Sequence, residues 1–366
     1  MEQIKTAVIS QSLDLHAAAV VWGLRRKGVD SQLLTFADCA VSGGVSLSMD
    51  AESSHLLLSS EESGSIDLCR FSGFWLRRTA RIPDLPDELL NEDAEIAKAD
   101  WSAYLRSLTF ILAGLGKYCL NDPRTKCFED TKPYQLQVAR RLGFRVPKTY
   151  VGNDFGQMRA TFCHENRVAY KTLTTNAWTG DRTNRVIRAT YTRTLQLDAG
   201  EWRSFRVCPA IVQEYVEKAY EVRATVIGKD IIAVGINSQS DENTRVDWRG
   251  IEIYKRKDSF FFLPNIPTDV RQLIAQYCSE FGLEFCALDF IVTPTGDWVF
   301  LEGNNSGQFL FCESMVPETM LLDRFCNFFA ARSGASGSRV SVTLNEFEGT
   351  SEGRRFLSMW RDSRRS

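Results

Sequence analysis

The feature that most constrains this chain is a pair of apolar runs, ALDFIV and WVFLEGN, which flank a short turn and carry one acidic residue each. The turn segment, TPTGD, holds a proline and a glycine, so the three pieces together predict a β-hairpin. If the turn centres between Thr295 and Gly296, Asp289 pairs with Glu302 and their Cβ atoms lie about 5 Å apart. Because side chains alternate along a strand, Asn304 lies on the same face as Glu302.

Two like charges that face each other in an apolar hairpin repel, so something has to neutralise them. A divalent cation with oxygen ligands would do so, and Mg²⁺ that holds the phosphates of a nucleotide is its commonest setting. We therefore predict that Asp289, Glu302 and Asn304 bind Mg²⁺. The alternative is that one carboxylate lies at a strand end and is merely solvated. The chain has only three histidines and no Cys-x-x-Cys pair, which disfavours zinc.

A lysine inside an apolar strand is the second marked feature. The run VAYKTL places Lys171 in a strand, and a buried ammonium needs an anionic partner, which a phosphate would supply. The alternative is a lysine that extends from an edge strand into solvent. Residues 174–184 are small and polar, which predicts a mobile lid without regular structure. The sequence G-x-x-x-x-G-K-[ST] does not occur, so the site is not a P-loop.

Three further stretches carry candidate residues with less specific signals. Lys132 opens a predicted helix over 132–142 and by itself would be a surface lysine. Residues 208–217 form an apolar strand that enters a polar connection. Glu221 and Arg223 alternate on one face of the next strand, where Arg223 either pairs with Glu221 or holds a phosphate in a bidentate manner.

The composition is that of a soluble globular protein and argues against a nucleic-acid-binding or membrane protein. Hydrophobic residues make up 44% and charged residues 25%, and the net charge is -2. No apolar run reaches the roughly 20 residues that span a bilayer, and the N-terminal segment lacks the apolar stretch of a signal peptide. The ten cysteines are scattered, mostly in apolar runs, which predicts reduced, buried thiols in a cytoplasmic protein.

The order of the predicted elements indicates an α/β (α+β) chain. A strand at 4–9, a helix at 15–27 and a strand at 32–35 form a β-α-β opening that is typical of a parallel sheet. The elements predicted after it are helices at 94–115, 132–142, 268–282 and 313–331, strands at 74–76, 118–120, 146–151, 168–173, 186–191 and 210–216, and hairpins at 220–236 and 285–302. The tail from Ser333, which is first Gly/Ser-rich and then basic, is expected to be loosely ordered.

Taken together and in this order, these stretches resemble the ATP-grasp superfamily, and they are most similar to the ATP-grasp peptide maturases that make microviridin-type peptides (graspetides). The similarity covers roughly residues 4–330, and it is the order and spacing of the motifs that make it specific. The matching stretches are DLHA (14–17), FWLRR (74–78), DTK (130–132), GFRVPKT (143–149), YKTL (170–173), VQEYV (212–216), VDWR (246–249) and FLEGNNSGQFLF (300–311).

The resemblance implies the ATP-grasp fold, in which a parallel-sheet N-terminal domain precedes two α+β lobes that enclose ATP. The implied divisions are an N-terminal domain (1–125), a central lobe with the mobile lid (126–214), a C-terminal lobe with the Mg²⁺ site (215–332) and the tail (333–366). It also implies that ATP is held by two lysines, by the linker between the lobes and by an acidic residue at the ribose. In that order the matching positions are Lys132 and Lys171, then Glu214, Tyr215 and Val216, and then Glu221.

The remaining implied roles concern catalysis and the metal. Arg223 matches a basic position near the phosphates and the acyl group, and we expect it to stabilise the developing oxyanion, with Arg249 as a second candidate. The three residues of the predicted Mg²⁺ site match the metal ligands of the family. The sequence departs from the family pattern at the lid, which has one glycine, and at Gly303, which replaces a larger residue between two ligands and would alter their geometry slightly.

The function that the resemblance implies is an ATP-dependent and Mg²⁺-dependent ligase. It would join Asp or Glu side chains of a ribosomal precursor peptide to Thr or Ser hydroxyls or Lys amines through an acyl phosphate. The expected partner is a precursor peptide with a leader segment, and the related enzymes suggest a homodimer. The nearest alternative is an ATP-grasp ligase for free amino acids or small acids. The alternative of another class is a non-catalytic nucleotide- or peptide-binding regulator.

Overall fold

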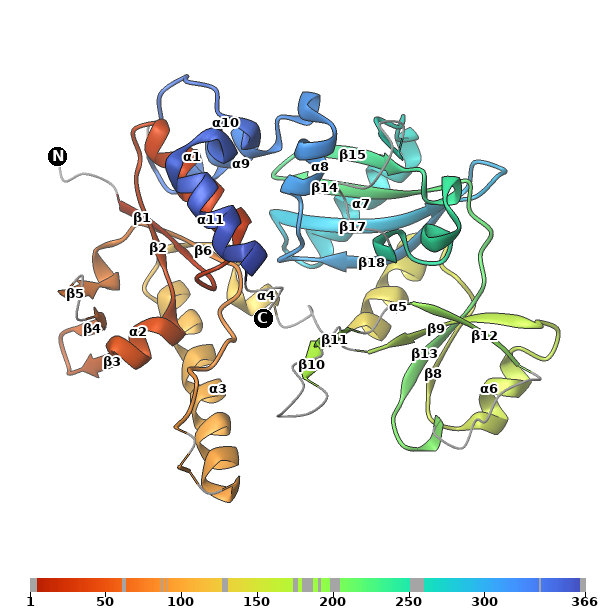
Figure 1. Cartoon of the computed structure of the whole chain (residues 1–366), viewed down its shortest axis with the longest axis horizontal. Coiled ribbons are helices and arrows are strands. Elements are labelled where there is room, and N and C mark those ends of the chain that lie inside the picture. Colours follow the sequence, from red (N-terminus) through yellow and green to blue (C-terminus); the bar gives the residue numbers. More distant parts are fainter. Residues whose placement is uncertain are drawn as a thin grey trace. The chain divides into compact units, whose positions relative to one another are not determined.

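The computed structural model describes residues 5–60, 64–86, 88–89, 91–126, 131–173, 177–179, 187–189, 192–197, 205–250, 260–335 and 337–362. Contacts between residues divide the chain into two units (Figure 1). Unit 1 comprises Met1–Lys126, Leu283–Phe285 and Ser306–Ser366, and unit 2 comprises Cys127–Gly282 and Cys286–Asn305.

Unit 1 contains the parallel sheet that the β-α-β opening predicts. Its strands lie in the order β2-β1-β6-β7, and β1 pairs in parallel with both β2 and β6. The strands are β1 (Lys5–Ile9), β2 (Asp30–Leu34), β6 (Gly73–Leu76) and β7 (Tyr118–Leu120). Helix α1 (Leu15–Arg26) connects β1 to β2 and begins where the Asp14 carboxylate accepts hydrogen bonds from the backbone N–H groups of His16 and Ala17.

A second, antiparallel sheet of unit 1 lies in the segment for which the sequence predicts no strands. It consists of β3 (Gly43–Met49), β4 (Ser54–Ser60) and β5 (Gly64–Asp67), which follow the short helix α2 (Phe36–Ser42). Leu56 and Leu58 alternate with exposed or half-buried neighbours and are buried in the same core as the parallel sheet. This sheet is therefore an extension of the core of unit 1.

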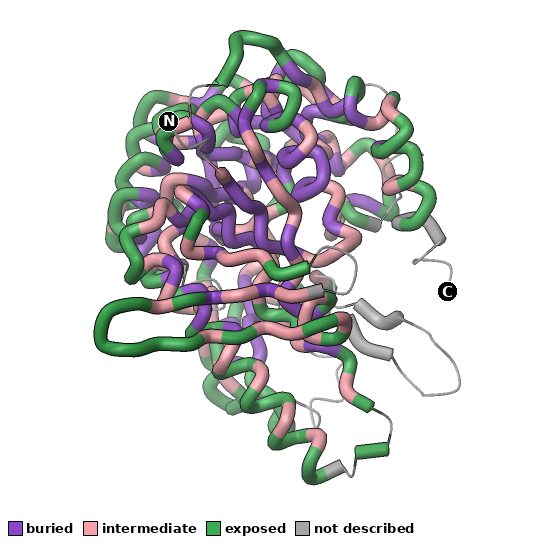
Figure 2. The backbone as a smooth tube through the Cα atoms, turned by 90° about the vertical axis from the view of Figure 1, so that its left-hand side faces the viewer, coloured by how far each residue is buried: buried purple, intermediate pink, exposed green. Residues whose placement is uncertain are grey.

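The long helix α3 (Asn91–Gly114) is buried along only half of its length, and the short helix α4 (Pro123–Lys126) follows β7. Leu105, Leu108 and Leu112 lie one turn apart and are buried in the core of unit 1. The preceding turns are exposed or half-buried, as the green and pink helix at the bottom of Figure 2 shows.

The single helix predicted at 313–331 is wrong, because the structure has two helices there. They are α8 (Leu310–Met315) and α9 (Leu321–Arg332). Pro317 begins a 3-10 turn between them, and Met320 after that turn has a φ of 48°. Helix α9 contributes Phe325 to the core of unit 1, where the centres of the Trp75 and Phe325 rings lie 4.5 Å apart.

The tail is also ordered differently from the prediction. We expected residues 333–366 to be loosely ordered, yet they contain α10 (Leu344–Gly349) and α11 (Ser351–Asp362). The Thr343 and Glu346 side chains form a capping box at the start of α10. The buried Glu313 carboxylate accepts hydrogen bonds from the backbone N–H groups of Leu322 at 2.6 Å and Leu344 at 2.7 Å. It thereby holds the starts of α9 and α10 together.

Unit 2 consists of two antiparallel sheets with helices. The first sheet has the order β12-β9-β13-β8, and the second has the order β16-β15-β14-β17-β18. Strands β10 and β11 form a separate two-stranded sheet. The strands are β8 (Thr149–Gly152), β9 (Arg167–Thr172), β10 (Ala177–Thr179), β11 (Ile187–Ala189), β12 (Arg193–Gln196), β13 (Ala210–Glu214), β14 (Tyr220–Ile227), β15 (Asp230–Ile236), β16 (Phe261–Phe262), β17 (Phe285–Val292) and β18 (Trp298–Asn304). The helices are α5 (Lys132–Leu142), α6 (Phe155–Thr161) and α7 (Thr268–Glu280).

Several expectations for unit 2 have a definite outcome. Helix α5 spans the predicted residues and ends at Gly143, which has a φ of 105°. Part of the segment 174–184, which we expected to lack regular structure, forms strand β10, and the rest of it lies outside the described residues. The predicted boundary between residues 214 and 215 falls inside unit 2 and stays a prediction. Residues 306–332, which we placed in the C-terminal lobe, group with unit 1 instead.

None of the helices in the described part of the chain combines the length and the apolar character that crossing a membrane requires.

A buried ion pair in unit 1 accounts for two of the motif stretches. The Asp14 Oδ2 atom lies 2.7 Å from Arg77 Nε, and the two side chains are 1% and 0% exposed. Arg77 also donates hydrogen bonds to the backbone carbonyls of Ser306 at 2.8 Å and Gly307 at 3.1 Å. Although burial alone would raise it, the Arg77 guanidinium holds the pKa of Asp14 well below its ordinary value. These residues therefore stabilise the N-terminal unit.

We predict that Asp14→Asn destabilises the protein by about 3–5 kcal/mol at pH 7, because it leaves the buried Arg77 charge uncompensated. Since the folded pKa of Asp14 is depressed, its contribution is present above the unfolded value of about 3.9 and is lost as the pH falls below it. Urea unfolding of wild type and variant at several pH values measures both effects. The difference between their free energies of unfolding should become smaller below about pH 4. Asp38→Asn on the exposed face of α2 is the control, and equal stability of the two variants at pH 7 would contradict the assignment.

Candidate active site

Strands β17 and β18 form the predicted hairpin, and Asp289 pairs directly with Glu302. The pairing arises differently from the regular ladder that the sequence suggested. Closer to the turn, the strands pair one residue out of that register, Phe290 with Phe300, and a β-bulge beside Asp289 makes Leu301 the extra residue of β18. The bulge restores the predicted pairing, and it leaves the adjacent Leu301 and Glu302 both lining one pocket.

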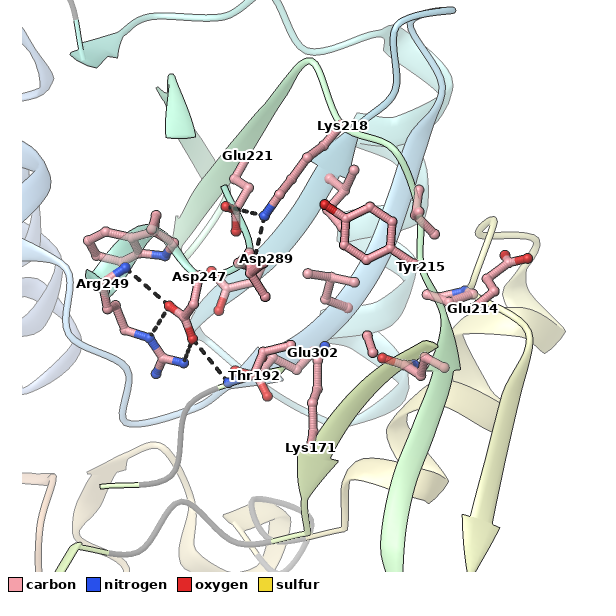
Figure 3. A pocket seen from close by; sticks show the side chains of 18 of the residues that line it. Lys171, Thr192, Glu214, Tyr215, Lys218, Glu221, Asp247, Arg249, Asp289 and Glu302 are labelled. Carbon is pink, nitrogen blue, oxygen red and sulfur yellow. Dashed lines mark hydrogen bonds and ion pairs between the residues drawn. The ribbon is translucent and has the colours of Figure 1, made fainter. Parts of the chain in front are cut away.

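The pocket lies in unit 2, where β9 and β13 of the first sheet meet β14, β17 and β18 of the second (Figure 3). The structure brings ten of the eleven candidate site residues to its lining, and the eleventh, Asn304, lies within 3.5 Å of both carboxylates. The ten are Lys132, Lys171, Glu214, Tyr215, Val216, Glu221, Arg223, Arg249, Asp289 and Glu302.

Each carboxylate of the opposed pair has its own cationic partner. Arg223 Nε lies 2.7 Å from Asp289 Oδ1, and Lys132 Nζ lies 3.2 Å from Glu302 Oε2. The Asn304 Nδ2 atom lies 3.5 Å from Asp289 Oδ2 and 3.4 Å from Glu302 Oε1. The pair is thus neutralised from two sides and joined by an amide, and the four charged side chains are only 11–28% exposed.

The pKa values of the two carboxyl groups move in opposite directions. Burial, together with the Glu302 charge, raises the pKa of Asp289 above its usual range despite Arg223. Burial also acts on Glu302, but the ammonium groups of Lys132 and Lys171 hold its pKa below the usual range. Such opposite shifts within one cluster are typical of functional sites.

Lys171 extends from β9 toward Glu302 in Figure 3. Burial lowers the pKa of Lys171, and the nearby Lys132 charge lowers it further, while Glu302 opposes this change. The structure therefore places two ammonium groups and one carboxylate at the same end of the pocket, where an additional anion would be stabilised.

Of the two alternatives for Arg223, the ion pair with Glu221 is wrong, and the contact with a phosphate stays a prediction. Its predicted ion-pair partner, Glu221, contacts Lys218 instead, with Lys218 Nζ 2.7 Å from Glu221 Oε1, and Arg223 pairs with Asp289. Lys218 also donates a hydrogen bond to the Val246 carbonyl at 3.1 Å, and its side chain is 4% exposed. Lys218 lines the pocket in addition to the predicted residues, and its position three residues before Glu221 is the signal that the sequence offers for it.

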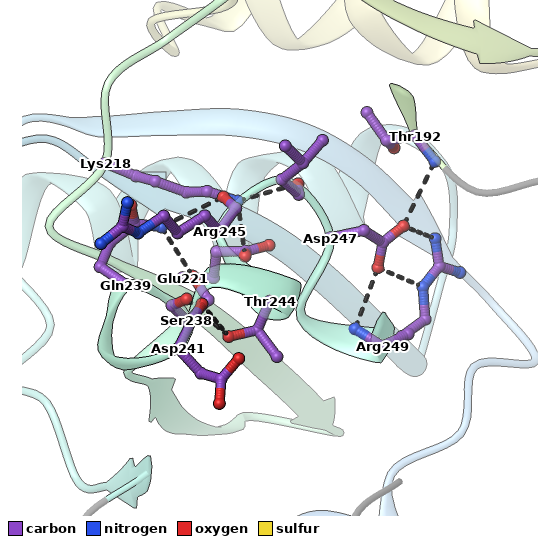
Figure 4. A network of polar contacts seen from close by, with 11 residues as sticks. Thr192, Lys218, Glu221, Ser238, Gln239, Asp241, Thr244, Arg245, Asp247 and Arg249 are labelled. Atoms are coloured by element: carbon purple, nitrogen blue, oxygen red, sulfur yellow. Dashed lines mark hydrogen bonds and ion pairs between the residues drawn. The ribbon is translucent and has the colours of Figure 1, made fainter. Parts of the chain in front are cut away.

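Arg249 is held in place by a second carboxylate that was not assigned a role (Figure 4). The Asp247 carboxylate accepts hydrogen bonds from Arg249 Nε at 2.8 Å and Arg249 Nη2 at 2.6 Å, and from the Thr192 backbone N–H at 3.3 Å. Although burial alone would lower it, this carboxylate holds the pKa of Arg249 above its ordinary value. The bidentate pair fixes the guanidinium plane at the rim of the pocket.

The linker between the two sheets lines the pocket with Glu214, Tyr215 and Val216. The Glu214 N–H donates to the Lys148 carbonyl at 3.0 Å, and the Lys148 N–H donates back to Glu214 Oε1 at 3.2 Å. The Glu214 side chain therefore binds the backbone of Lys148. The Arg167 guanidinium lies 3.6 Å from the centre of the Tyr215 ring, which fixes the ring beside the pocket.

The donor set at the carboxylate end fits a hard divalent cation such as Mg²⁺. Asp289 and Glu302 supply carboxylate oxygens from directly opposed positions, and the Asn304 amide lies within 3.5 Å of both. The amide can present its oxygen after a flip, so all three side chains offer oxygen ligands. Like-charged groups brought this close need a positive charge between them, which a cation would supply in addition to Arg223 and Lys132.

No family model matches the chain, and no curated protein matches it either. Solved structures match it over most of its length. One is a RiPP-associated ATP-grasp ligase of Chryseobacterium gregarium in complex with ADP and a leader and core peptide, at 22% identity and a TM-score of 0.80, covering 93% of this chain and 99% of that chain. A second is the macrocyclase MdnC of Microcystis aeruginosa MRC bound with precursor peptide MdnA, at 22% identity and a TM-score of 0.75, covering 90% and 100%.

A third match is the ATP-grasp ligase PsnB complexed with minimal precursor, Mg and ADP, at 20% identity and a TM-score of 0.66, covering 90% of this chain and 98% of that chain. The mixed α/β architecture, with one parallel sheet and several antiparallel sheets, is therefore the fold of ATP-grasp ligases. This confirms the fold that the sequence resemblance implies.

We predict that Lys218→Met destabilises the protein by about 3 kcal/mol, because it leaves the Glu221 carboxylate buried without its cation. The double variant Lys218→Met/Glu221→Gln should recover most of this loss, since it removes both charges. Urea unfolding at pH 7 measures the three stabilities. Lys229→Met in the exposed turn between β14 and β15 is the control, and a double variant that is no more stable than Lys218→Met would disprove the pairing.

Proposed function

We propose that this protein is an ATP-dependent ligase that activates a carboxylate as an acyl phosphate and joins it to a hydroxyl or amine of a precursor peptide. The observation that carries the proposal is the grouping of two opposed carboxylates with two lysines at one end of a single pocket. Glu302 lies 3.2 Å from Lys132, pairs directly with Asp289 across the hairpin and interacts electrostatically with Lys171. The fold is that of ATP-grasp ligases, which agrees with this use of the pocket.

ATP is the first substrate, and the pocket offers a place for each of its parts. Lys132 and Lys171 would hold the phosphates, because they supply two positive charges at the buried end. The backbone around Tyr215 and Val216 would meet the adenine, and Glu221, which also lines the pocket, would hold the ribose. Lys218 then orients Glu221 through their 2.7 Å contact.

The magnesium ion would be held by Asp289, Glu302 and Asn304. When bound, it supplies positive charge that neutralises the phosphate oxygens and orients them. The lysines and arginines of the pocket supply the remaining charge. We propose Mg²⁺ over zinc because all three side chains offer oxygen ligands and the contacts involve neither histidine nor cysteine.

The chemistry would proceed in two balanced steps. An oxygen of the substrate carboxylate attacks the γ-phosphorus, the bond from that phosphorus to the bridging oxygen breaks, and ADP leaves with that oxygen. The hydroxyl or amine then attacks the acyl carbon and loses its proton, and inorganic phosphate leaves. Arg223 and Arg249 would stabilise the negative charge that develops on the acyl oxygen, because both guanidinium groups line the pocket.

The proposed second substrate is a ribosomal precursor peptide with a leader segment, whose Asp or Glu side chains become linked to Thr or Ser hydroxyls as esters or to Lys amines as amides. The support is the likeness to structures that hold leader, core or precursor peptides. We also propose a homodimer in the cytoplasm, as the resemblance suggests. Every cysteine within the described ranges is a free thiol, which suits a reducing compartment.

The test of the proposal is to incubate the protein with Mg²⁺, ATP and the peptide encoded beside its gene. We expect release of ADP and a peptide that has lost the mass of one water molecule for each bond formed, as mass spectrometry measures. ADP release with free amino acids or small acids and no peptide would support the alternative ligase. Tight ADP binding without turnover on any of these substrates would support the non-catalytic regulator and overturn the proposal.

The metal assignment predicts that Asp289→Asn lowers turnover by at least about 100-fold, because it removes a charged ligand of Mg²⁺. ADP release under saturating ATP and peptide measures the loss. Asp269→Asn in the exposed first turn of α7 is a matched control that should keep wild-type turnover. Unchanged activity of Asp289→Asn would refute the role of this residue.

A further inference from the structure

The backbone between two of the proposed metal ligands is held by a residue of helix α5. Gly303 lies between Glu302 and Asn304 on β18, which is the edge strand of its sheet. Its N–H group donates a hydrogen bond to Gln135 Oε1 at 3.0 Å, and Gln135 is 4% exposed. An edge strand lacks a second neighbouring strand, so a side chain that binds its open N–H group fixes where the strand lies.

The Cα atom of Gly303 is covered by a tyrosine of helix α7. A β-carbon built on Gly303 would lie 2.8 Å from the Tyr277 hydroxyl oxygen and 3.0 Å from Tyr277 Cε1. Tyr277 is 1% exposed, and the centre of its ring lies 4.7 Å from that of the Phe281 ring and 5.2 Å from that of the Phe300 ring. The ring therefore cannot move away easily, and only a glycine fits at position 303.

Helix α5 contacts this segment of β18 twice, through residues one turn apart. Lys132 Nζ contacts the Glu302 side chain at 3.2 Å, and Gln135 binds the next backbone N–H group. Side chains at positions i and i+3 of a helix lie on the same face, so a single helix fixes both the side chain of Glu302 and the backbone beside it.

We propose that Gln135 and Tyr277 are positioning residues, which fix the backbone at Gly303 and thereby aim Glu302 and Asn304 at one cation. This inference rests on the proposed function, because it takes the cation to be the Mg²⁺ of the nucleotide. It also explains why a glycine at position 303 replaces the larger residue of the family pattern. The Tyr277 ring occupies the volume that a larger side chain at position 303 would fill, so the ligands are held from outside the strand.

Loss of such a partner behind the metal ligands typically weakens metal binding by 10–100-fold. Gln135→Met keeps the length of the side chain but removes the acceptor of the Gly303 N–H group. Mg²⁺ is expected to increase the affinity for ADP, and the half-saturating Mg²⁺ concentration is the one that gives half of this increase. We expect Gln135→Met to raise it about tenfold. Calorimetric titration of the full chain with ADP, with and without Mg²⁺, measures this, and the affinity for metal-free ADP should stay within about threefold.

The matched control for this variant is Gln137→Met, since Gln137 lies on the exposed face of the same helix. It should leave the Mg²⁺ dependence unchanged. A purely structural role of Gln135 would lower the unfolding temperature and weaken ADP binding equally with and without Mg²⁺. That result, or a Mg²⁺ dependence equal to that of Gln137→Met, would overturn the positioning role.

The tyrosine is tested through a rescue experiment. Gly303→Ala should raise the half-saturating Mg²⁺ concentration about tenfold, because the new methyl group meets the Tyr277 hydroxyl. Tyr277→Phe removes that hydroxyl, so the same Gly303→Ala change made in the Tyr277→Phe background should cost at least about threefold less. Equal costs in the two backgrounds would show that Tyr277 does not set the position of the strand.

The wild-type titration separates this inference from the proposed function. If Mg²⁺ does not increase the affinity of the wild type for ADP, the proposed metal site fails and the positioning role fails with it. If Mg²⁺ increases the affinity of the wild type and of every variant alike, the proposed function stands and only the positioning role is refuted.

Discussion

The opposition of Asp289 and Glu302 across the β17–β18 hairpin is the interaction on which the rest of the pocket depends. Two carboxylates on apolar strands repel, and burial makes the repulsion stronger. The structure compensates with Arg223 from β14 at 2.7 Å and Lys132 from α5 at 3.2 Å. Because these cations come from different elements, the carboxylate pair is tolerated only when helix, sheet and hairpin have assembled. The electrostatic stability of the site therefore depends on the packing of unit 2.

The pairing of Asp289 with Glu302 could be predicted from sequence, but the register nearer the turn could not. The apolar runs and the Pro/Gly turn specify a hairpin, and the facing pair Asp289 and Glu302 is present. Near the turn, however, Phe290 pairs with Phe300, which is one residue away from the predicted register. Leu301 makes up the difference as a bulge. A local pattern cannot reveal a bulge here, because the extra residue is apolar and the strand pattern continues through it.

Other parts of the structure depend on partners far away in the sequence, and they could not be predicted. Lys218 is buried because it contacts Glu221 and also the Val246 carbonyl, 28 residues later. The tail is ordered because Glu313 accepts the N–H group of Leu344, so a Gly/Ser-rich and basic segment becomes helical where it meets a buried acceptor. Composition reports the tendency of a segment in isolation, whereas these contacts lower its free energy only after the core has formed.

Gly303 shows how a departure from a motif can be understood once its surroundings are known. In the sequence it is only a smaller residue between two ligands, which suggests a slightly altered ligand geometry. In the structure the Tyr277 ring, 26 positions earlier in the chain, fills the space beside it, and Gln135 binds its N–H group at 3.0 Å. Tyr277 packs against the Cα atom of Gly303 and Gln135 binds its N–H group, so this position is restrained although glycine has no side chain. The rigidity that a ligand position needs can thus be supplied by two helices, α5 and α7, rather than by the ligand-bearing strand.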